Sequence, residues 1–267
     1  MMKIIRHEWN LFLVALCFFT RIPLSRYVDY SAENLNQSNR YFAAVGAVVG
    51  LIAGLVYWLA YVFFPHLIAI ILSIVASVLL TGAFHEDGMA DICDGFGGGQ
   101  NKEQKLAIMK DSRLGTYGSL GLFLTLTLKI VSLYYLIGYA GGYGFYLVYI
   151  IFCAHILSRA LAASFIYNYS YVSQDDSKAK PLAFKQTKAD LYILLGSSLI
   201  FTIFLGTQLI YLIVFLLIIR TLLGRFYKWQ IGGYTGDCLG AAQQISEVCI
   251  YLFFYAMFKI PLLFLVF

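Results

Sequence analysis

Long uninterrupted runs of apolar residues constrain this chain more than any other feature. Residues 41–85 contain two such runs, separated only by Pro65 and His66, and each approaches the ~20 residues that a helix needs to cross a hydrocarbon core. Backbone polar groups cannot stay unpaired in lipid, so only helices and closed barrels span membranes. The runs lack the apolar/polar alternation of barrel strands. We therefore expect an all-α, polytopic membrane helical bundle.

The composition excludes a soluble globular fold. Of 267 residues, 61% are hydrophobic and 12% are charged, which is about half the charged share that is usual in soluble domains. The net charge of +5 comes from basic residues scattered among connecting segments. This distribution argues against nucleic-acid binding and for contacts with lipid headgroups. The five cysteines show no CxxC pair or zinc-ligand spacing, so neither disulfides nor structural zinc are expected.

About seven spanning helices are predicted, within a single integral-membrane catalytic domain over residues 1–267. Residues 8–20 are too short to span, and the arginines that follow them indicate an interfacial or re-entrant helix. No internal repeat is visible, and no linker is long enough to join a second domain. The approximate ranges of the seven helices are 41–64, 67–85, 118–138, 145–166, 190–206, 208–224 and 240–258.

The connecting segments divide into two groups by charge. Lys and Arg are concentrated in four segments and absent from the short loops between them. Basic loops stay on the cytoplasmic side, so we expect a multi-pass protein of the inner (cytoplasmic) membrane with its N-terminus inside and the tail after Lys259 outside. The basic segments are 21–40, 86–117, 167–189 and 225–236, and the loops without Lys or Arg are 65–66, 139–144 and 206–208.

The segment 81–99 is the most informative part of the sequence for function. It places Glu86, Asp87, Asp91 and Asp94 at the end of a spanning helix, with no basic residue nearby in sequence. If the segment is helical, the three aspartates share one face, and their mutual repulsion requires a cation. Oxygen ligands favour magnesium, manganese or calcium over zinc, and magnesium is often completed by substrate phosphates. The alternative is a solvated acidic cap outside the bilayer.

Glycines surround these acids and suggest a way for a substrate to approach them. Gly88, Gly95 and the glycines at 97–99 lack side chains, so a phosphate group would be able to come close to the backbone there. Together with the aspartates, they predict a magnesium-dependent site for a phosphorylated substrate.

A second cluster, residues 110–118, lies just before the third predicted spanning helix. Arg113 suits the oxygens of a phosphate, and Asp111 would orient Arg113 or join the metal shell. The alternative is a basic cytoplasmic flank followed by a glycine turn. Its closeness to the acidic segment favours a functional role.

A third cluster, residues 232–240, leads into the last helix. Thr235 or Asp237 would cap that helix, whose N-terminus would attract phosphate. Glu247 lies near the same face and is expected to be buried against protein rather than lipid. The alternative is capping combined with hydrogen bonds between helices.

Arg159 stands inside the fourth predicted spanning helix and needs a polar partner there. It either snorkels to the headgroups from the end of its helix or forms part of an anion pocket. The first interpretation is slightly favoured.

Four motifs resemble those of the cobalamin synthase family, the adenosylcobinamide-GDP ribazoletransferases. Residues 85–95 read HxDGxADxxDG, and residues 111–118 read DSRLGTxG. The family's opening signature is similar to FTRIP at 19–23, and its late motif is similar to TGDxLGA at 235–241. The matches occur in order over nearly the whole chain. Position 86 is variable in the family motif, so Glu86 is the weakest of the acidic candidates.

The resemblance implies the last assembly step of vitamin B12 (cobalamin) biosynthesis. A ribose hydroxyl of α-ribazole, or of its 5′-phosphate, would attack the cobinamide phosphate of adenosylcobinamide-GDP and release GMP. Mg²⁺ is the implied cofactor, and the active site would face the cytoplasm. The DxxDG portion at 91–95 is also similar to the start of the CDP-alcohol phosphotransferase motif, which serves only as a chemical analogy.

The hypothesis is that the aspartates hold one or two magnesium ions on the diphosphate, Arg113 steadies its oxygens, and either Asp111 or one of the aspartates accepts the proton of the attacking hydroxyl. The catalytic candidates are Asp87, Asp91, Asp94, Asp111 and Arg113; the metal candidates are Asp87, Asp91, Asp94 and, least strongly, Glu86; the substrate-binding candidates are Arg21, Gly88, Gly95, Ser112, Arg159, Thr235, Asp237 and Glu247.

Two other functions stay open from the residues alone. Another membrane phosphotransferase, acting on a lipid alcohol, needs the same acids. A cation-coupled transporter predicts acids near the bilayer midplane and an inverted repeat, whereas these acids gather at one end of a helix. The expected partners are the small-molecule substrates and membrane lipid, with no nucleic acid, and a homo-oligomer is compatible with the sequence.

Overall fold

The computed structural model describes residues 2–139, 144–172 and 185–264. Within these ranges the chain is helical and has no strand, and the only β-type pairing is an isolated bridge between Tyr171 and Tyr234. The expected all-α architecture is confirmed. The α-helices are α1 (Met2–Phe19), α2 (Ala32–Ser38), α3 (Phe42–Phe63), α4 (His66–Thr81), α5 (Phe84–Gly98), α6 (Lys102–Met109), α7 (Thr116–Tyr139), α8 (Gly144–Asn168), α9 (Lys188–Thr202), α10 (Thr207–Ile231) and α11 (Gly236–Phe264). Three short 3₁₀ turns are η1 (Ser25–Tyr27), η2 (Asn39–Tyr41) and η3 (Ile203–Leu205).

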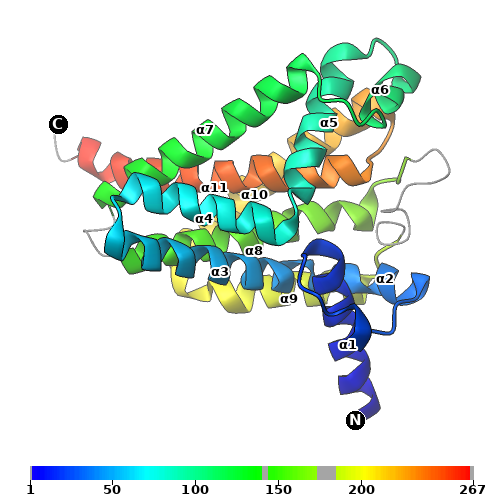
Figure 1. Ribbon diagram of the computed structural model, residues 1–267, viewed down its shortest axis with the longest axis horizontal. Helices are drawn as coiled ribbons and strands as arrows, with labels where there is room; N and C mark the ends of the chain where they lie inside the picture. Colours follow the sequence, from blue (N-terminus) through cyan, green and yellow to red (C-terminus); the bar gives the residue numbers. More distant parts are fainter. Residues whose placement is uncertain (1, 140–143, 173–184, 265–267) are drawn as a thin grey trace.

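The long helices form a bundle around α8. Helices α3, α4, α8, α9, α10 and α11 run along the long axis of the molecule, while α7 crosses it obliquely (Figure 1). Helix α8 is the most enclosed of the candidate spans, with 72% of its apolar stretch buried, against 17% for α10. Gly46 and Gly50 of α3 let the two helices meet closely, because a Cβ atom on either would collide with the α8 backbone.

All seven predicted spanning segments are helices, but fewer of them meet the requirements for a span. Five helical stretches are long and apolar enough, and a sixth arises if the bent pair α4 and α5 counts as one span. Helix α11 is not among them; its N-terminal half carries Asp237, Gln243, Gln244 and Glu247. The polytopic membrane class is confirmed, with the five spans being Ala32–Phe63, Thr116–Gly138, Phe145–Asn168, Lys188–Leu205 and Thr207–Ile231.

The predicted helix over 67–85 ends early, at Thr81, and this break is decisive for the site. Gly82 and Ala83 both adopt left-handed conformations, with φ of 69° and 60°. Glycine does so readily at the end of a helix, whereas alanine is strained there. The two residues turn the chain by 89°, so α5 lies across the ends of the long helices (Figure 1). We therefore treat α5 as lying outside the spanning segments.

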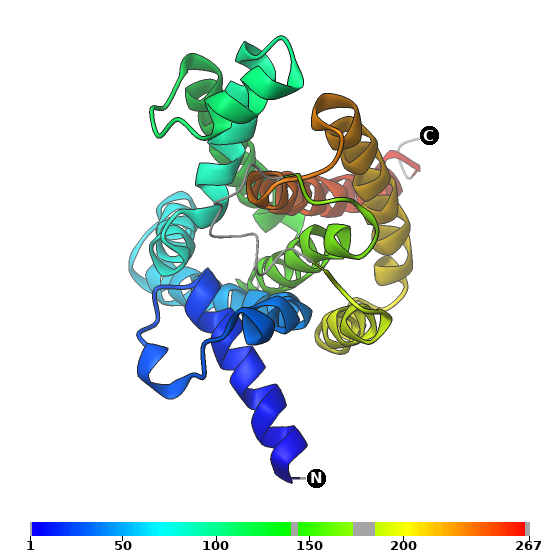
Figure 2. The same ribbon diagram turned by 90° about the vertical axis from the view of Figure 1, so that its right-hand side faces the viewer.

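The N-terminal helix is longer than the predicted segment 8–20, since α1 begins at Met2. It projects crosswise from the same end of the bundle as α5 (Figures 1 and 2). Its outer part exposes Met2, Ile4, Ile5 and Trp9. This geometry is what a helix at the membrane interface requires, and its position in the interface stays a prediction.

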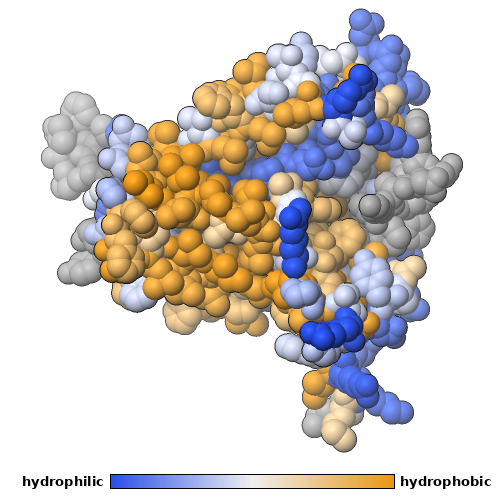
Figure 3. Space-filling view, viewed as in Figure 1, coloured by the Kyte–Doolittle hydropathy of each residue, from blue (hydrophilic) through white to orange (hydrophobic). Residues whose placement is uncertain are grey.

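The surface is divided into an apolar body and a polar end. Hydrophobic side chains cover most of the face over α3 and α4, and hydrophilic ones gather at the end that carries α2, α5 and α6 (Figure 3). That end collects the predicted basic segments 21–40 and 86–117, while the loop at Pro65 lies at the opposite end (Figure 1). Lys178 and Lys180 of segment 167–189 lie outside the described residues. The assignment of the polar end to the cytoplasm stays a prediction.

Candidate active site

The predicted row of aspartates exists, because α5 is helical throughout Phe84–Gly98. Asp87 is exposed, Asp91 is partly buried and Asp94 is buried. Since they are spaced by four and three residues, they share one side of the helix. Because α5 lies at the polar end of the molecule, the row lies there too, and not at the middle of the bundle.

A close crossing of α5 and α11 adds a fourth carboxylate from far along the chain. A Cβ atom on Gly88 would lie 3.0 Å from the backbone oxygen of Asp237 and 3.3 Å from the Cα of Gly240. Thr235 caps α11 as predicted: the Cys238 N–H donates to its Oγ1 at 3.3 Å, and its hydroxyl donates to Asp237 Oδ2 at 3.3 Å. The third sequence cluster thus meets α5 through Asp237.

The electrostatics show that these carboxylates repel one another. Burial, together with the charges of Asp237, Asp87 and Asp94, raises the pKa of Asp91 to about 7. In the part of the chain that the structure describes, no Lys or Arg forms an ion pair with Asp87, Asp91 or Asp237. Among the described residues, no ion pair therefore neutralises the negative charge of this cluster.

Asp94 differs from the other aspartates because both of its carboxylate oxygens already accept hydrogen bonds from the backbone. Its Oδ2 accepts the Gly115 N–H at 2.7 Å, and its Oδ1 accepts the Gly118 N–H at 2.8 Å. A Cβ atom on either glycine would collide with the carboxylate, so only glycine allows this contact. Asp94 thereby fixes the start of α7, and the loop before it, against α5.

That loop carries the predicted pair of Asp111 and Arg113. The Arg113 Nε lies 3.0 Å from both carboxylate oxygens of Asp111, and its Nη2 lies 2.5 Å from Oδ2. These hydrogen bonds lower the pKa of Asp111. Asp111 and Arg113 are therefore in the contact that the sequence suggested, and their catalytic roles stay a prediction. Ser112 lies between them, and the Arg113 side chain is 87% exposed, so it is accessible to a substrate.

The donor atoms suit magnesium, although no complete site is preformed. Among the described residues, no group of three or more His, Cys, Asp or Glu side chains is arranged to hold a metal ion. Magnesium commonly binds through one or two carboxylates and takes the remaining ligands from water and substrate phosphates. Asp87, Asp91 and Asp237 offer oxygen ligands and uncompensated charge, so they fit such an ion.

The predicted role of Gly88 and Gly95 in phosphate approach is wrong. Both glycines are buried against protein: Gly88 against α11, and Gly95 against α6, where a Cβ atom would lie 3.0 Å from the Lys105 backbone oxygen. The missing side chains permit helix packing and leave no room for a ligand.

A buried polar network that the sequence did not predict lies below the acidic row. The Lys129 Nζ of α7 is 3.1 Å from Glu247 Oε1 and 2.9 Å from Gln244 Oε1. Gln244 in turn donates to Glu86 Oε1 at 2.9 Å. Glu247 is 1% exposed, so its predicted burial against protein is confirmed. Glu86 belongs to this network, and not to the row that faces Asp237.

The snorkelling interpretation of Arg159 is wrong. Its side chain is buried, because α8 continues to Asn168 and leaves no path to the surface. It contacts His155 through Nη1, at 3.0 Å from Nδ1 and 3.1 Å from the backbone oxygen. His155 lies 3.6 Å from Glu247. The isolated Lys129 and His155 in apolar stretches were the sequence signal for this network, since ionisable residues in spans are seldom without a role.

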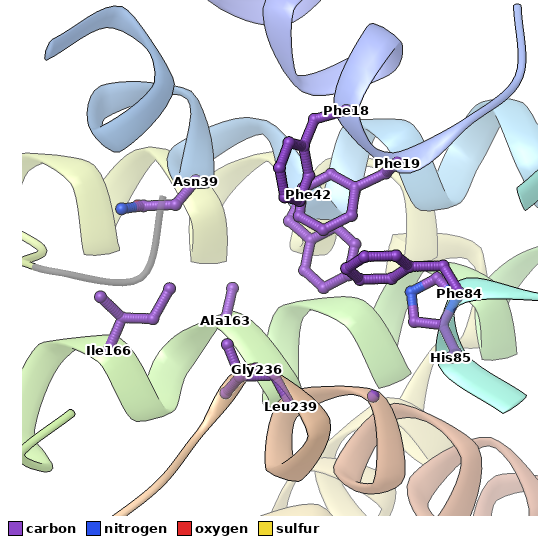
Figure 4. A pocket seen from close by; sticks show the side chains of 11 residues that line it. Phe18, Phe19, Asn39, Phe42, Phe84, His85, Ala163, Ile166, Gly236 and Leu239 are labelled. Atoms are coloured by element: carbon purple, nitrogen blue, oxygen red, sulfur yellow. The ribbon is translucent and has the colours of Figure 1, made fainter. Parts of the chain in front are cut away.

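Two elements hold α5 in place from the N-terminal side. The Arg21 N–H donates to the Leu80 oxygen at 2.7 Å, and its side chain packs against Gly82 at the bend. Phe19, Phe42 and Phe84 surround His85 in a small pocket (Figure 4). Its free volume is about 20 Å³, which holds one or two water molecules and no aromatic base. The pocket positions α5, and Arg21 supports the bend.

Comparisons with known proteins agree on one family. The family model for cobalamin-5-phosphate synthase matches residues 11–255. An adenosylcobinamide-GDP ribazoletransferase of Shewanella frigidimarina is 51% identical over 92% of this chain and 94% of its own length. A protein of the same name from Vibrio parahaemolyticus is 44% identical over 96% of this chain and 95% of its own length. No solved structure matches the chain.

Proposed function

This chain belongs to the cobalamin-5-phosphate synthase family, the adenosylcobinamide-GDP ribazoletransferases, and we propose that Asp87, Asp91 and Asp237 carry its reaction with the help of magnesium. The observation that supports this is the meeting of these carboxylates at the α5–α11 crossing, where no described Lys or Arg forms an ion pair with them. Family membership removes the transporter and the lipid-alcohol phosphotransferase as competing functions.

The substrates follow from the family. A ribose hydroxyl of α-ribazole, or of α-ribazole 5′-phosphate, attacks the cobinamide phosphorus of adenosylcobinamide-GDP. The bond from that phosphorus to the oxygen bridging to GMP breaks, and GMP leaves with the electron pair. Displacement at a diphosphate depends mainly on positioning and on neutralising charge, so the protein needs cationic groups around the phosphates and a proton acceptor near the hydroxyl.

The loop fixed by Asp94 supplies one cationic group. Arg113 is exposed and held by Asp111, so its remaining N–H groups are free to steady non-bridging phosphate oxygens. Asp111 is a poor proton acceptor, because Arg113 hydrogen-bonds both of its oxygens. The acceptor is therefore a member of the Asp87, Asp91 and Asp237 group, and Asp94 positions the loop instead of binding the metal.

When bound, magnesium would supply neutralisation of the diphosphate and of the charge that builds on GMP. Asp87, Asp91 and Asp237 would hold it. The polar end of the bundle faces the cytoplasm in this proposal, because both the nucleotide and the corrinoid substrate are water-borne.

The test uses purified protein in lipid nanodiscs with adenosylcobinamide-GDP and α-ribazole. GMP and a cobalamin product should appear in equal amounts when magnesium is present. Removing divalent cations with a chelator should abolish both, and adding magnesium in excess should restore them. Equal turnover in the presence of the chelator would contradict the metal assignment. Failure to form GMP and the cobalamin product when magnesium is present would contradict the function.

A further inference from the structure

A groove between α8, α9 and α10 lies on the other side of the bundle from α4 and α5 (Figure 2). Its volume is about 470 Å³, within the ~300–1,000 Å³ typical of small-molecule sites. Most of its walls are leucine and other apolar side chains. It shares no residue with the acidic cluster, so the family reaction does not account for it.

One cationic side chain stands in this groove. Arg220, from α10, is held through Nε by Ser164 Oγ at 2.6 Å and through Nη2 by the Ser164 backbone oxygen at 2.9 Å and Asn168 Oδ1 at 2.5 Å. Its guanidinium also lies 5.2 Å from the Phe165 ring centre. These contacts fix its position, and its Nη1 forms no hydrogen bond with the described residues.

Arg220 has no counter-ion within the described chain. None of the ion pairs there includes it, although it is only partly exposed, whereas the buried cations Lys129 and Arg159 lie in the network around Glu247. A cation in a spanning helix normally has an anionic partner or an aqueous path. Its partners Ser164 and Asn168 are neutral, so no described residue compensates its charge.

The groove has a polar end and an apolar end in the right order for a lipid. Ser164 and Asn168 belong to the last turns of α8, so Arg220 lies near the end of the bundle that carries the basic loops. From there the groove continues inward past Leu195 and Leu199 of α9. The cation is therefore near headgroup depth, and the apolar channel extends toward the middle of the membrane.

We propose that this groove binds one phospholipid, with its phosphate on Arg220 and an acyl chain in the channel. The planar guanidinium suits phosphate oxygens, and the free Nη1 provides the donors. Two independent features of the groove are met in this way: the phosphate compensates the charge of Arg220, and the acyl chain fills the apolar volume. This site is separate from the catalytic site and does not depend on the proposed function.

Native mass spectrometry of the detergent-purified protein tests the proposal with three probes. Phosphatidylglycerol should remain bound as one copy per chain. Diacylglycerol with the same chains lacks the phosphate, and glycerol 3-phosphate lacks the chains; both should bind at least ten-fold more weakly. Equal retention of diacylglycerol would mean an unspecific apolar contact, and equal retention of glycerol 3-phosphate would mean a plain anion site. A dimer that excludes lipid would mean that a second copy covers the groove. Each of these results would overturn the proposal.

Two variants locate the site, and one serves as a control. Arg220→Gln should weaken phosphatidylglycerol binding at least ten-fold, while Arg225→Gln, an exposed arginine on the same helix, should leave it unchanged. Because Arg220→Gln also removes contacts to α8, Leu195→Trp provides a second route. It fills the channel from a position that is 41% exposed and keeps Arg220. Wild-type lipid binding by a folded Leu195→Trp protein would contradict the groove as the site.

Discussion

At the scale of single residues, similar acids have different tasks. Asp94 and Asp91 lie three residues apart on α5, yet backbone N–H groups occupy both oxygens of Asp94, while Asp91 faces other carboxylates. The motif spacing alone placed both on one face and gave no reason to separate them. The difference arises from the loop before α7, which folds back onto Asp94.

Asp94→Asn should therefore act mainly on stability and on the position of Arg113. The amide keeps one acceptor but places an NH₂ group against a backbone N–H, and leaving such a buried group unsatisfied costs about 1–3 kcal/mol. We expect a lower thermal midpoint in detergent together with reduced turnover. Asp91→Asn should keep the wild-type midpoint. A fully stable Asp94→Asn protein would contradict the anchoring role.

A second residue-scale prediction concerns the buried ion pair. Lys129→Met leaves Glu247 without its lysine partner in an enclosed environment, and breaking one side of a buried pair costs about 3–5 kcal/mol. We expect a large fall in the thermal midpoint. Replacing both partners, as Lys129→Met with Glu247→Leu, should recover part of the loss. If the double variant loses as much stability as Lys129→Met and Glu247→Leu lose separately and added together, the pair does not act as a unit.

At the scale of elements, the site depends on how α5 crosses α11. Gly88→Ala would place a methyl group 3.0 Å from the backbone oxygen of Asp237, so the backbone of α11 must shift slightly away from α5, and Asp237 shifts with it. We expect a clear loss of turnover. Gly98→Ala is the matched control on the same helix, because its nearest neighbour is 3.4 Å away. Equal activity of the two variants would show that the crossing does not set the carboxylate geometry.

The elements also show what the sequence can and cannot predict. Apolar runs predicted where the helices lie, and the three-and-four spacing predicted that the aspartates share a face. The break at Gly82 and Ala83 was missed, because one alanine in a left-handed conformation has no sequence signature. The closeness of Asp237 to Asp91 could not be predicted from the sequence either, since it depends on the packing of Gly88 against Gly240.

At the scale of the whole molecule, the carboxylates and basic loops share one end of the bundle. We predict that this end is cytoplasmic. In a cysteine-free background, Glu103→Cys on α6 should resist a membrane-impermeant maleimide in intact cells and react after lysis. Pro65→Cys, in the loop at the opposite end, should react in intact cells. The reverse pattern would place the site outside the cytoplasm.

The same polarity gives the two proposed sites separate surroundings: the acidic cluster is open to water, and the groove of Arg220 is open to lipid. Loss of lipid binding should therefore leave the carboxylates in place, because the lining of the groove includes no residue of α5 or α11.

We propose above that the acids at the α5–α11 crossing hold a divalent cation for the release of GMP. The most direct measurement is the rate of GMP release by Asp87→Asn across a magnesium titration, beside wild-type protein and the control Glu103→Gln, which removes an exposed acid of α6. We expect Asp87→Asn to lose turnover by about two orders of magnitude or more, because it removes a carboxylate that would hold the metal, while Glu103→Gln behaves as wild type. Near-normal turnover of well-folded Asp87→Asn at every magnesium concentration would contradict the claim.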